Sequence, residues 1–174
     1  LHIPIVYNCG GYERVETLRM LEGYVDVYLP DLKYFSSQLS GALSGAPDYF
    51  LHASAALSEM IRQTGTPVFD KNKMLVRGTL IRHMVLPGQK EDSIRLLGWM
   101  AENLPKGGFL LSLLSQYTPF FKAAEHPQIN RRLTSYEYGK VLGAALELGL
   151  DTGYMQERSS AREEYTPPFD LEGL

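Results

Sequence analysis

Four short apolar segments of the chain end in, or contain, the functional groups of a small-molecule site. They supply Asn8-Cys9-Gly10-Gly11, Asp31-Leu32-Lys33, Arg82-His83 and Ser115-Gln116-Tyr117. A carboxylate, cations, amides and glycine backbone suit a ligand that has both an amino and a carboxylate group, or a phosphate. Asp31 and Lys33 are two residues apart, so on an extended segment they point the same way. Taken alone, that pair is equally well explained as an exposed ion pair of little energetic consequence.

The elements that must position these groups alternate between strand and helix. Apolar β-branched runs predict strands over 2–8, 25–29, 80–86 and 109–114. Helical spacing predicts four helices, over residues 13–24, 47 to about 64, 93–104 and 135–148. The last of them begins at the capping box Thr134-Ser135-Tyr136-Glu137. Residues 36–46, rich in Ser and Gly, are expected to form a loop, and residues 70–73 a turn. Inward-facing residues of the second helix are expected to be Leu51, Ala55, Leu57, Met60 and Ile61.

Strand and helix in alternation predict an α/β fold with a parallel sheet, its apolar strands covered on both faces. The candidates are a doubly wound sheet and part of a (β/α) TIM-type barrel. A closed barrel takes about 250 residues, so about four parallel βα units favour a partial barrel over residues 1–157, with 158–174 as a polar C-terminal extension. In either fold the carboxyl ends of the strands face the ligand. The open edges of a partial barrel also predict self-association.

Composition excludes several classes of protein. The 174 residues are 44% hydrophobic with a net charge of −3, which indicates one globular core and gives no basic surplus for nucleic-acid binding. No apolar stretch is long enough to cross a membrane and no leader opens the chain, so a cytoplasmic location is expected. Cys9 is the only cysteine, which rules out an internal disulfide and predicts a packing role. His83 is expected to bond to a backbone carbonyl, and no metal ligands are predicted.

The polar segments lie within longer blocks that resemble a known family. These blocks are Pro4-Ile5-Val6-Tyr7-Asn8-Cys9-Gly10-Gly11-Tyr12-Glu13, Val25-Asp26-Val27-Tyr28-Leu29-Pro30-Asp31-Leu32-Lys33-Tyr34, Ile81-Arg82-His83-Met84-Val85-Leu86-Pro87-Gly88 and Leu114-Ser115-Gln116-Tyr117. Over residues 1 to about 156, their order and spacing resemble radical S-adenosylmethionine proteins related to pyruvate formate-lyase-activating enzyme. They are most similar to the branch whose first block is Tyr-Asn-x-x-Gly-Tyr-Glu.

This resemblance implies a partial barrel that holds a four-iron four-sulfur (4Fe-4S) cluster on a Cys-x3-Cys-x2-Cys loop. S-adenosylmethionine chelates the fourth iron through its amino and carboxylate groups. One electron, from a donor such as flavodoxin or ferredoxin, then yields a 5′-deoxyadenosyl radical that abstracts hydrogen. In activating enzymes the hydrogen comes from a glycine of a partner protein, a glycyl-radical enzyme.

The resemblance also suggests which residues bind S-adenosylmethionine. Asn8 falls where activating enzymes have an Asp near the methionine end of the cofactor, and an amide there loses the negative charge. Asp31 and Lys33 match the family's Asp-x-Lys, which flanks the same group. Arg82 matches an Arg that approaches the cofactor's carboxylate, where a planar bidentate donor is apt.

The remaining candidates are less direct. Gly10 and Gly11 form the turn after the first strand, where backbone N–H groups can approach a ligand, although Gly-x-Gly-x-x-Gly is absent. Gln116 and Tyr117 stand where activating enzymes have a His that contacts the ribose, and each can hydrogen-bond a hydroxyl. No residue is predicted to be catalytic.

The chain departs most clearly from the family in lacking the three-cysteine loop, which in the family lies upstream of the first strand seen here. The expectation is therefore a truncated chain, inactive by itself, whose cluster is bound by upstream cysteines. A non-catalytic module that binds a partner protein and a phosphate-binding barrel enzyme remain alternatives.

Overall fold

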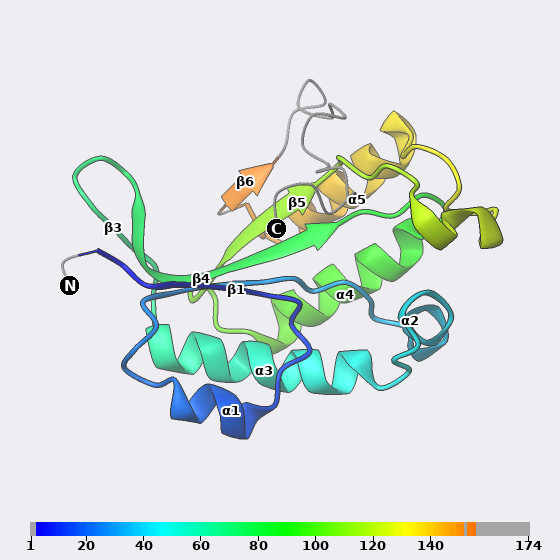
Figure 1. Ribbon diagram of the computed structural model, residues 1–174. Helices are drawn as coiled ribbons and strands as arrows, with labels where there is room; N and C mark the ends of the chain where they lie inside the picture. The colour runs from blue at the N-terminus through cyan, green and yellow to red at the C-terminus, as the bar shows by residue number, and fades with distance from the viewer. Residues whose placement is uncertain (1–2, 152, 156–174) are drawn as a thin grey trace, which may run out of the picture.

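The computed structural model describes residues 3–151 and 153–155, and the predicted extension over 158–174 lies outside them. Strands and helices alternate along the chain, as Figure 1 shows, which confirms the predicted α/β class. The elements are β1 (Val6–Cys9), α1 (Val15–Met20), β2 (Val27–Pro30), α2 (Ser37–Ser44), α3 (Tyr49–Thr64), β3 (Val68–Phe69), β4 (Leu75–Met84), α4 (Lys90–Asn103), β5 (Leu110–Leu114), the 3-10 helix η1 (Phe121–Glu125), α5 (Ser135–Glu147) and β6 (Gly153–Met155).

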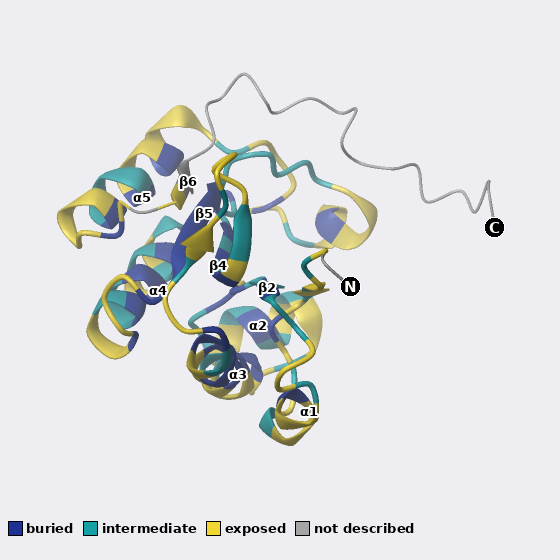
Figure 2. Cartoon of the chain, turned by 90° about the vertical axis from the view of Figure 1, so that its left-hand side faces the viewer, coloured by how far each residue is buried: buried dark blue, intermediate teal, exposed yellow. Residues whose placement is uncertain are grey.

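The sheet follows the order of the chain. Its order is β1-β2-β4-β5-β6, each neighbouring pair is parallel, and β3 is joined antiparallel to β4. Because parallel connections are right-handed, strands that are added always on the same side carry their helices on one face. Figure 2 shows α1, α3, α4 and α5 along one face of the curved sheet.

The core lies between the sheet and these helices. Apolar side chains of β4 and β5 pack there against α3, α4 and α5 in one cluster, which includes Leu57, Ile81, Leu96, Leu97, Met100, Leu111, Leu113 and Val141. A smaller cluster joins α1, β2 and α3 through Leu18, Tyr28, Ala56 and Met60. The capping box at the start of α5 is confirmed, with Thr134 and Glu137 each bonding the other's backbone.

The second face of the sheet carries no helix within the described residues, so the prediction of strands covered on both faces is wrong for this part of the chain. Along β4, Ile81 and His83 are buried on the helix side, whereas Arg82 and Met84 are half-buried. This alternation follows from the two-residue period of a strand. At the edge strand β1, Val6 is 51% exposed. A face open to solvent is therefore available to polar groups.

Two predictions about the helices are corrected. Residues 36–46 contain α2 rather than a loop: Ser36 accepts a hydrogen bond from the Leu39 N–H, and Gly45 ends the helix in the left-handed conformation. The Ser and Gly residues are in part its caps. On α3, Leu51 and Ala55 are exposed instead of inward-facing, and the helix buries Ala53 and Ala56 beside Leu57.

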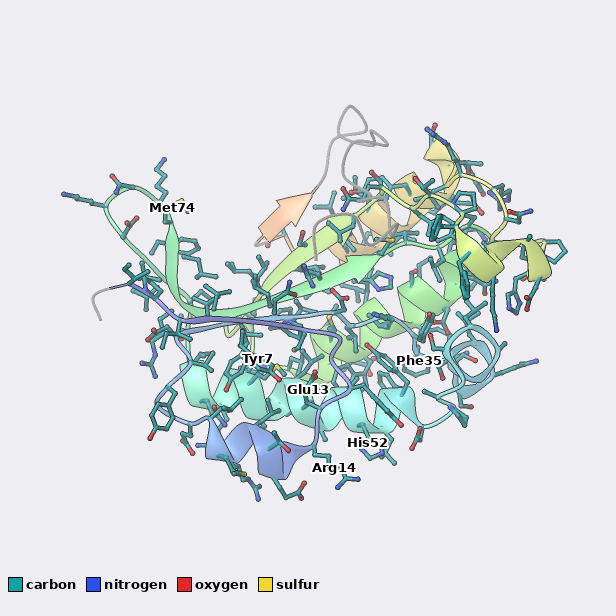
Figure 3. The ribbon with its side chains drawn as sticks, viewed as in Figure 1. Tyr7, Glu13, Arg14, Phe35, His52 and Met74 are labelled. Atoms are coloured by element: carbon teal, nitrogen blue, oxygen red, sulfur yellow. The ribbon has the colours of Figure 1, made fainter. Side chains whose placement is uncertain are left out.

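The β3–β4 hairpin and β6 were not predicted from the sequence. β4 begins at Leu75 rather than at residue 80, because its first half pairs with the short β3. The turn at 70–73 is confirmed, with the Asp70 carboxylate accepting the N–H groups of Asn72 and Met74. Figure 3 shows Met74 on this hairpin, at the opposite end of the sheet from Phe35. No described helix combines the length and apolarity that a membrane span requires.

Candidate functional site

The register of the sheet brings the predicted polar residues of β1, β2 and β4 onto one face. Asn8 pairs with Leu29, and an isolated bridge pairs Asp31 with Arg82. Paired residues share a face, and Leu29 and Asp31 are two residues apart, so Asn8, Asp31 and Arg82 all point to the open face. They lie at the carboxyl ends of consecutive parallel strands, as the sequence predicted.

Arg82 is the centre of this group. Its Nη2 donates to the Asn8 Oδ1 at 2.6 Å and forms an ion pair with the Asp31 Oδ1 at 2.7 Å. The Lys33 Nζ lies 3.8 Å from the other carboxylate oxygen of Asp31. The Nε of Arg82 is buried and has no hydrogen-bond partner among the described residues. Buried donors normally have partners, so this N–H is an exception among the described residues.

A cavity of about 240 Å³ adjoins these charges. Asp31, Lys33 and Arg82 line its polar part, and Tyr117 closes it from the segment after β5. Its remaining lining is Tyr34, Met84, Leu86 and Leu114. Burial raises the pKa of Tyr117, so the phenol stays protonated at neutral pH. Gln116, predicted beside Tyr117, is not among the lining residues, and Asn8 reaches the cavity only through Arg82.

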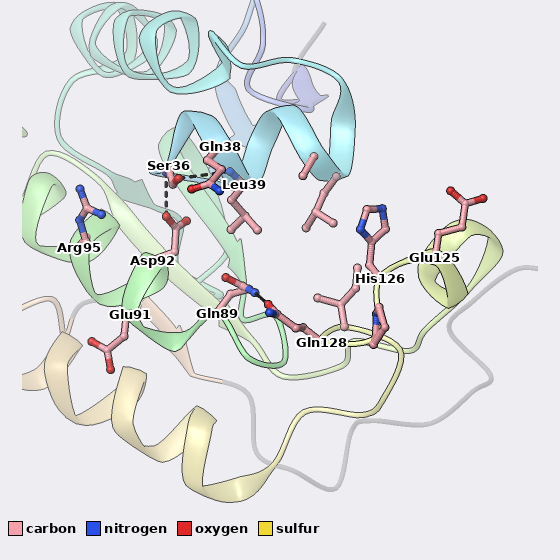
Figure 4. A pocket seen from close by; sticks show the side chains of 14 residues that line it. Ser36, Gln38, Leu39, Gln89, Glu91, Asp92, Arg95, Glu125, His126 and Gln128 are labelled. Carbon is pink, nitrogen blue, oxygen red and sulfur yellow. Dashed lines mark hydrogen bonds between the residues drawn. The ribbon is translucent and has the colours of Figure 1, made fainter.

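A larger cavity lies next to the site cavity. A cavity of about 540 Å³ shares Tyr34, Leu86 and Tyr117 with it and continues along α2 to Phe120 and Phe121. Beyond this lies a third cavity of about 530 Å³, drawn in Figure 4, where α2 faces residues 125–129. Its walls are tied together by a bond from Gln89 to Gln128 and by the Asp92 carboxylate, which accepts the N–H groups of Phe35 and Ser36. These larger spaces are not predictable from the sequence pattern, because it does not indicate α2.

Gly10 and Gly11 form the turn after β1, next to the exit of β2. Gly11 has a φ of 83°, and a Cβ there would overlap the Asp31 carbonyl oxygen. Only glycine permits this approach. The two exits are also linked by Tyr49, whose hydroxyl lies 3.0 Å from the Gly10 carbonyl oxygen and 2.9 Å from that of Asp31. Sequence reasoning missed Tyr49, because an aromatic residue near the start of a helix gives no signal of such a role.

Cys9 and Glu13 lie on the helix side of the sheet, away from the charged group. Cys9 packs against the cluster of Leu18 and Tyr28, which confirms its predicted packing role. Burial raises the pKa of its thiol to about 12, so it is not a thiolate at neutral pH. Burial also raises the pKa of Glu13, which Figure 3 shows between β1 and α3.

His83 has the structural role that the sequence predicted. Its Nδ1 lies 2.7 Å from the Leu32 carbonyl oxygen and its Nε2 lies 2.9 Å from the Ser93 Oγ. A carbonyl can only accept, so Nδ1 carries the hydrogen and Nε2 accepts from the serine hydroxyl. Burial lowers the pKa of this histidine, which keeps it neutral. Across the described ranges there is no cluster of three or more His, Cys, Asp or Glu residues able to hold a metal ion.

Comparison with known proteins gives one relative and no family. No protein-family profile matches the chain. The chain is 31% identical over 156 residues to a protein of Methanocaldococcus jannaschii described as "Uncharacterized protein MJ0674". The aligned region covers 88% of this chain and 41% of that protein. The chain is therefore similar to about two fifths of a longer archaeal protein.

Proposed function

We propose that the chain is part of a radical S-adenosylmethionine protein similar to pyruvate formate-lyase-activating enzyme, and that its sheet is part of a TIM-type barrel. The strand order supports the barrel. A doubly wound sheet reverses direction at a switch point and has helices on both faces, whereas this sheet follows chain order with its helices on one face. Strand β1 then provides an edge to which further strands, or a second copy of the chain, can be added.

The observation that carries the proposal is the group of Asn8, Asp31 and Arg82 with Lys33 beside it. An amino acid headgroup has one positive and one negative group, and this cluster has partners for both. The ammonium group can bind to the Asp31 carboxylate, while Asn8 holds the Arg82 guanidinium in place. The carboxylate can bind to Lys33 and to the Arg82 guanidinium, both of which line the site cavity. Asp31, Lys33 and Arg82 together carry one negative and two positive charges, and a zwitterionic headgroup leaves that sum unchanged.

The spaces around this group fit a ligand with such a headgroup. Small-molecule sites typically measure about 300–1,000 Å³, and the site cavity of about 240 Å³ is large enough for one end of a ligand. The adjoining cavity of about 540 Å³, with Tyr34 and Tyr117 at the junction, provides apolar and aromatic walls for the remainder. Tyr117 can offer its protonated hydroxyl to a ribose.

A phosphate fits this group less well. The Asp31 carboxylate lies 2.7 Å from the Arg82 Nη2 and would repel a phosphate at the same position. The Gly10-Gly11 turn precedes a helix of only 6 residues, which is a weak anion site. The Asp31 carboxylate, which can pair with an ammonium group but repels an anion, therefore favours a zwitterion over a phosphate.

The described residues do not supply an iron–sulfur site. The chain has one cysteine, Cys9, and its buried thiol is protonated. In this proposal the cluster is held by cysteines in another part of the protein. When bound, the cluster would supply the one electron that breaks the bond between sulfur and the 5′ carbon of S-adenosylmethionine, which gives methionine and a 5′-deoxyadenosyl radical. The substrate of the radical is proposed to be a glycyl residue of a partner protein, and the electron donor a flavodoxin or ferredoxin.

The first test is the coding sequence upstream of Leu1. We expect it to encode Cys-x3-Cys-x2-Cys, and its absence there would remove the proposed chemistry. The complete protein, reconstituted with iron and sulfide, should bind S-adenosylmethionine and release 5′-deoxyadenosine under reducing conditions. A protein that takes up iron but releases none would favour the protein-binding module instead.

The second test concerns the residues. Arg82→Ala and Lys33→Ala in the complete protein should each weaken S-adenosylmethionine binding about tenfold or more, as expected for the loss of a charged hydrogen bond. Matched controls are Arg77→Ala, at the other end of β4, where the side chain bonds the Gln63 and Thr64 carbonyls, and Lys71→Ala in the hairpin turn. Isothermal titration calorimetry would measure the affinities. Equal losses in the site and control variants would exclude the charged group from the binding site.

A further inference from the structure

The hydroxyl of Tyr49 joins backbone groups from two strand exits. It lies 3.0 Å from the Gly10 carbonyl oxygen and 2.9 Å from the Asp31 carbonyl oxygen, and it accepts a hydrogen bond of 3.0 Å from the Lys33 N–H. Its single hydrogen is shared between the two carbonyls. One side-chain atom therefore fixes the turn after β1 and both ends of Asp31-Leu32-Lys33.

The ring of Tyr49 is buried and packs against two other tyrosine rings. Tyr49 is the first residue of α3 and is 4% exposed. Its ring stacks on Tyr12 at 5.8 Å between centroids and meets the edge of Tyr34 at 5.5 Å. Burial raises the pKa of Tyr49, so its hydroxyl remains a donor at all physiological pH values.

The arrangement leaves little freedom to the residues that carry charge. Gly11 lies against the Asp31 carbonyl, where a Cβ would overlap that oxygen and would lie 3.1 Å from the Tyr49 hydroxyl. On the open face, the Asp31 carboxylate and Lys33 line the site cavity. Tyr49 lies behind them and does not line the cavity, so it touches the backbone of the site and not its contents.

We propose that Tyr49 is a positioning residue: its hydroxyl sets the spacing between the Gly10 turn and the Asp31–Lys33 segment, and so preorganises the groups that bind an amino acid headgroup. The inference rests on the proposed function, because the headgroup is that of S-adenosylmethionine. Groups that are held in place before binding bind more tightly, because no ordering is needed on association. Loss of the hydroxyl should thus weaken binding of the headgroup specifically.

The test is Tyr49→Phe in the complete protein with its cluster reconstituted, with Tyr28→Phe as the matched control. Tyr28 is also buried and also donates its hydroxyl, to the Gln63 Oε1 at 2.7 Å, but on the helix side of the sheet. Affinity is measured for S-adenosylmethionine and for 5′-methylthioadenosine, which lacks the amino acid headgroup. Thermal unfolding of all proteins provides the comparison of stability.

We expect Tyr49→Phe to weaken binding of S-adenosylmethionine about tenfold and that of 5′-methylthioadenosine less than about twofold, a ratio that a general loss of stability cannot produce. Tyr28→Phe should leave both affinities unchanged, although it should lower Tm about as much as Tyr49→Phe does. An unchanged S-adenosylmethionine affinity in Tyr49→Phe, or equal losses for both ligands, would overturn the positioning role while leaving the proposed function intact. A wild-type protein that binds no S-adenosylmethionine would overturn both.

Discussion

Arg82 and His83 are adjacent on β4 but lie in two different chemical environments. His83 points to the helices, is 1% exposed, and has a partner for each ring nitrogen. Arg82 points to the open face, bonds Asn8 and Asp31, and retains a buried Nε without a partner in the described part of the chain. A buried polar group with all its partners stabilises the fold, whereas a charged side chain that lines a cavity is available to a ligand.

The same difference separates the two faces of the sheet. On the helix face, Thr64 and Thr79 pair their buried hydroxyls at 3.0 Å and Glu59 binds Arg62, although the Glu13 Oε2 has no partner among the described residues. On the open face, the charges of Asp31, Lys33 and Arg82 are only partly buried and share a cavity. Stability and binding should thus respond separately to changes on the two faces.

The largest effect is expected for His83→Ala, which leaves the Leu32 carbonyl and the Ser93 hydroxyl without their partner and creates a cavity in the core. We expect it to lower the free energy of unfolding by about 3 kcal/mol or more. Denaturation with urea would measure this. A loss below about 1 kcal/mol would show that the buried side of β4 does not depend on the imidazole.

The second-largest loss of stability is expected for Gly11→Ala, in the turn after β1. The new Cβ would require a left-handed conformation and would overlap the Asp31 carbonyl, so we expect a loss of about 2 kcal/mol. Gly10→Ala is the control, because a Cβ at that neighbouring position meets no atom within 4 Å. Similar unfolding curves for the two variants would contradict the close approach of the strand exits.

Glu59 on the helix face should make stability depend on pH. Its hydrogen bonds with Arg62 lower the pKa of the carboxyl group to about 2 in the folded protein. Because its pKa is lowered in the folded protein, the ionised Glu59 carboxylate stabilises the fold above the unfolded pKa of about 4.5. This contribution is lost as the pH falls toward 2. We expect about 1–2 kcal/mol to be lost in that interval, since Arg62 is half-exposed.

In Glu59→Gln the decline of unfolding free energy between pH 4.5 and 2 should be shallower than in the wild type. Glu102→Gln, an exposed position with no ion pair in the described part of the chain, removes the same charge as a control. Parallel pH profiles for Glu59→Gln and the wild type would argue against this contribution.

The smallest change in stability is expected for Arg82→Ala. Its ion pair is partly exposed, and such pairs contribute about 0–1 kcal/mol, so the free energy of unfolding should change by less than about 1 kcal/mol. The same variant is expected to lose ligand affinity, whereas His83→Ala is expected to lose stability. If Arg82→Ala unfolds as readily as His83→Ala, the separation of the two faces is wrong.

The sequence predicts Asn8, Asp31 and Arg82 as neighbours because the carboxyl ends of consecutive parallel strands share one edge. It does not show which of Gln116 and Tyr117 lines the cavity. The segment after β5 is irregular, so no repeating pattern indicates which way each side chain points. It predicts a loop for residues 36–46, because Ser and Gly cap helices as readily as they form turns. The inward face of α3 is also read incorrectly, because Ala and Leu occupy both sides of that helix.

Local patterns in the sequence determine the alternation of strand and helix, the capping box of α5 and the turn at 70–73. Each depends on neighbours along the chain, which the sequence states directly. Only the tertiary structure decides that the second face of the sheet carries no helix from the described residues, that Arg82 joins Asn8 to Asp31, and that the Tyr49 hydroxyl ties Gly10 to Asp31. Those contacts join residues 18 to 74 positions apart, and their geometry is set by strand register and helix packing, which no single segment encodes.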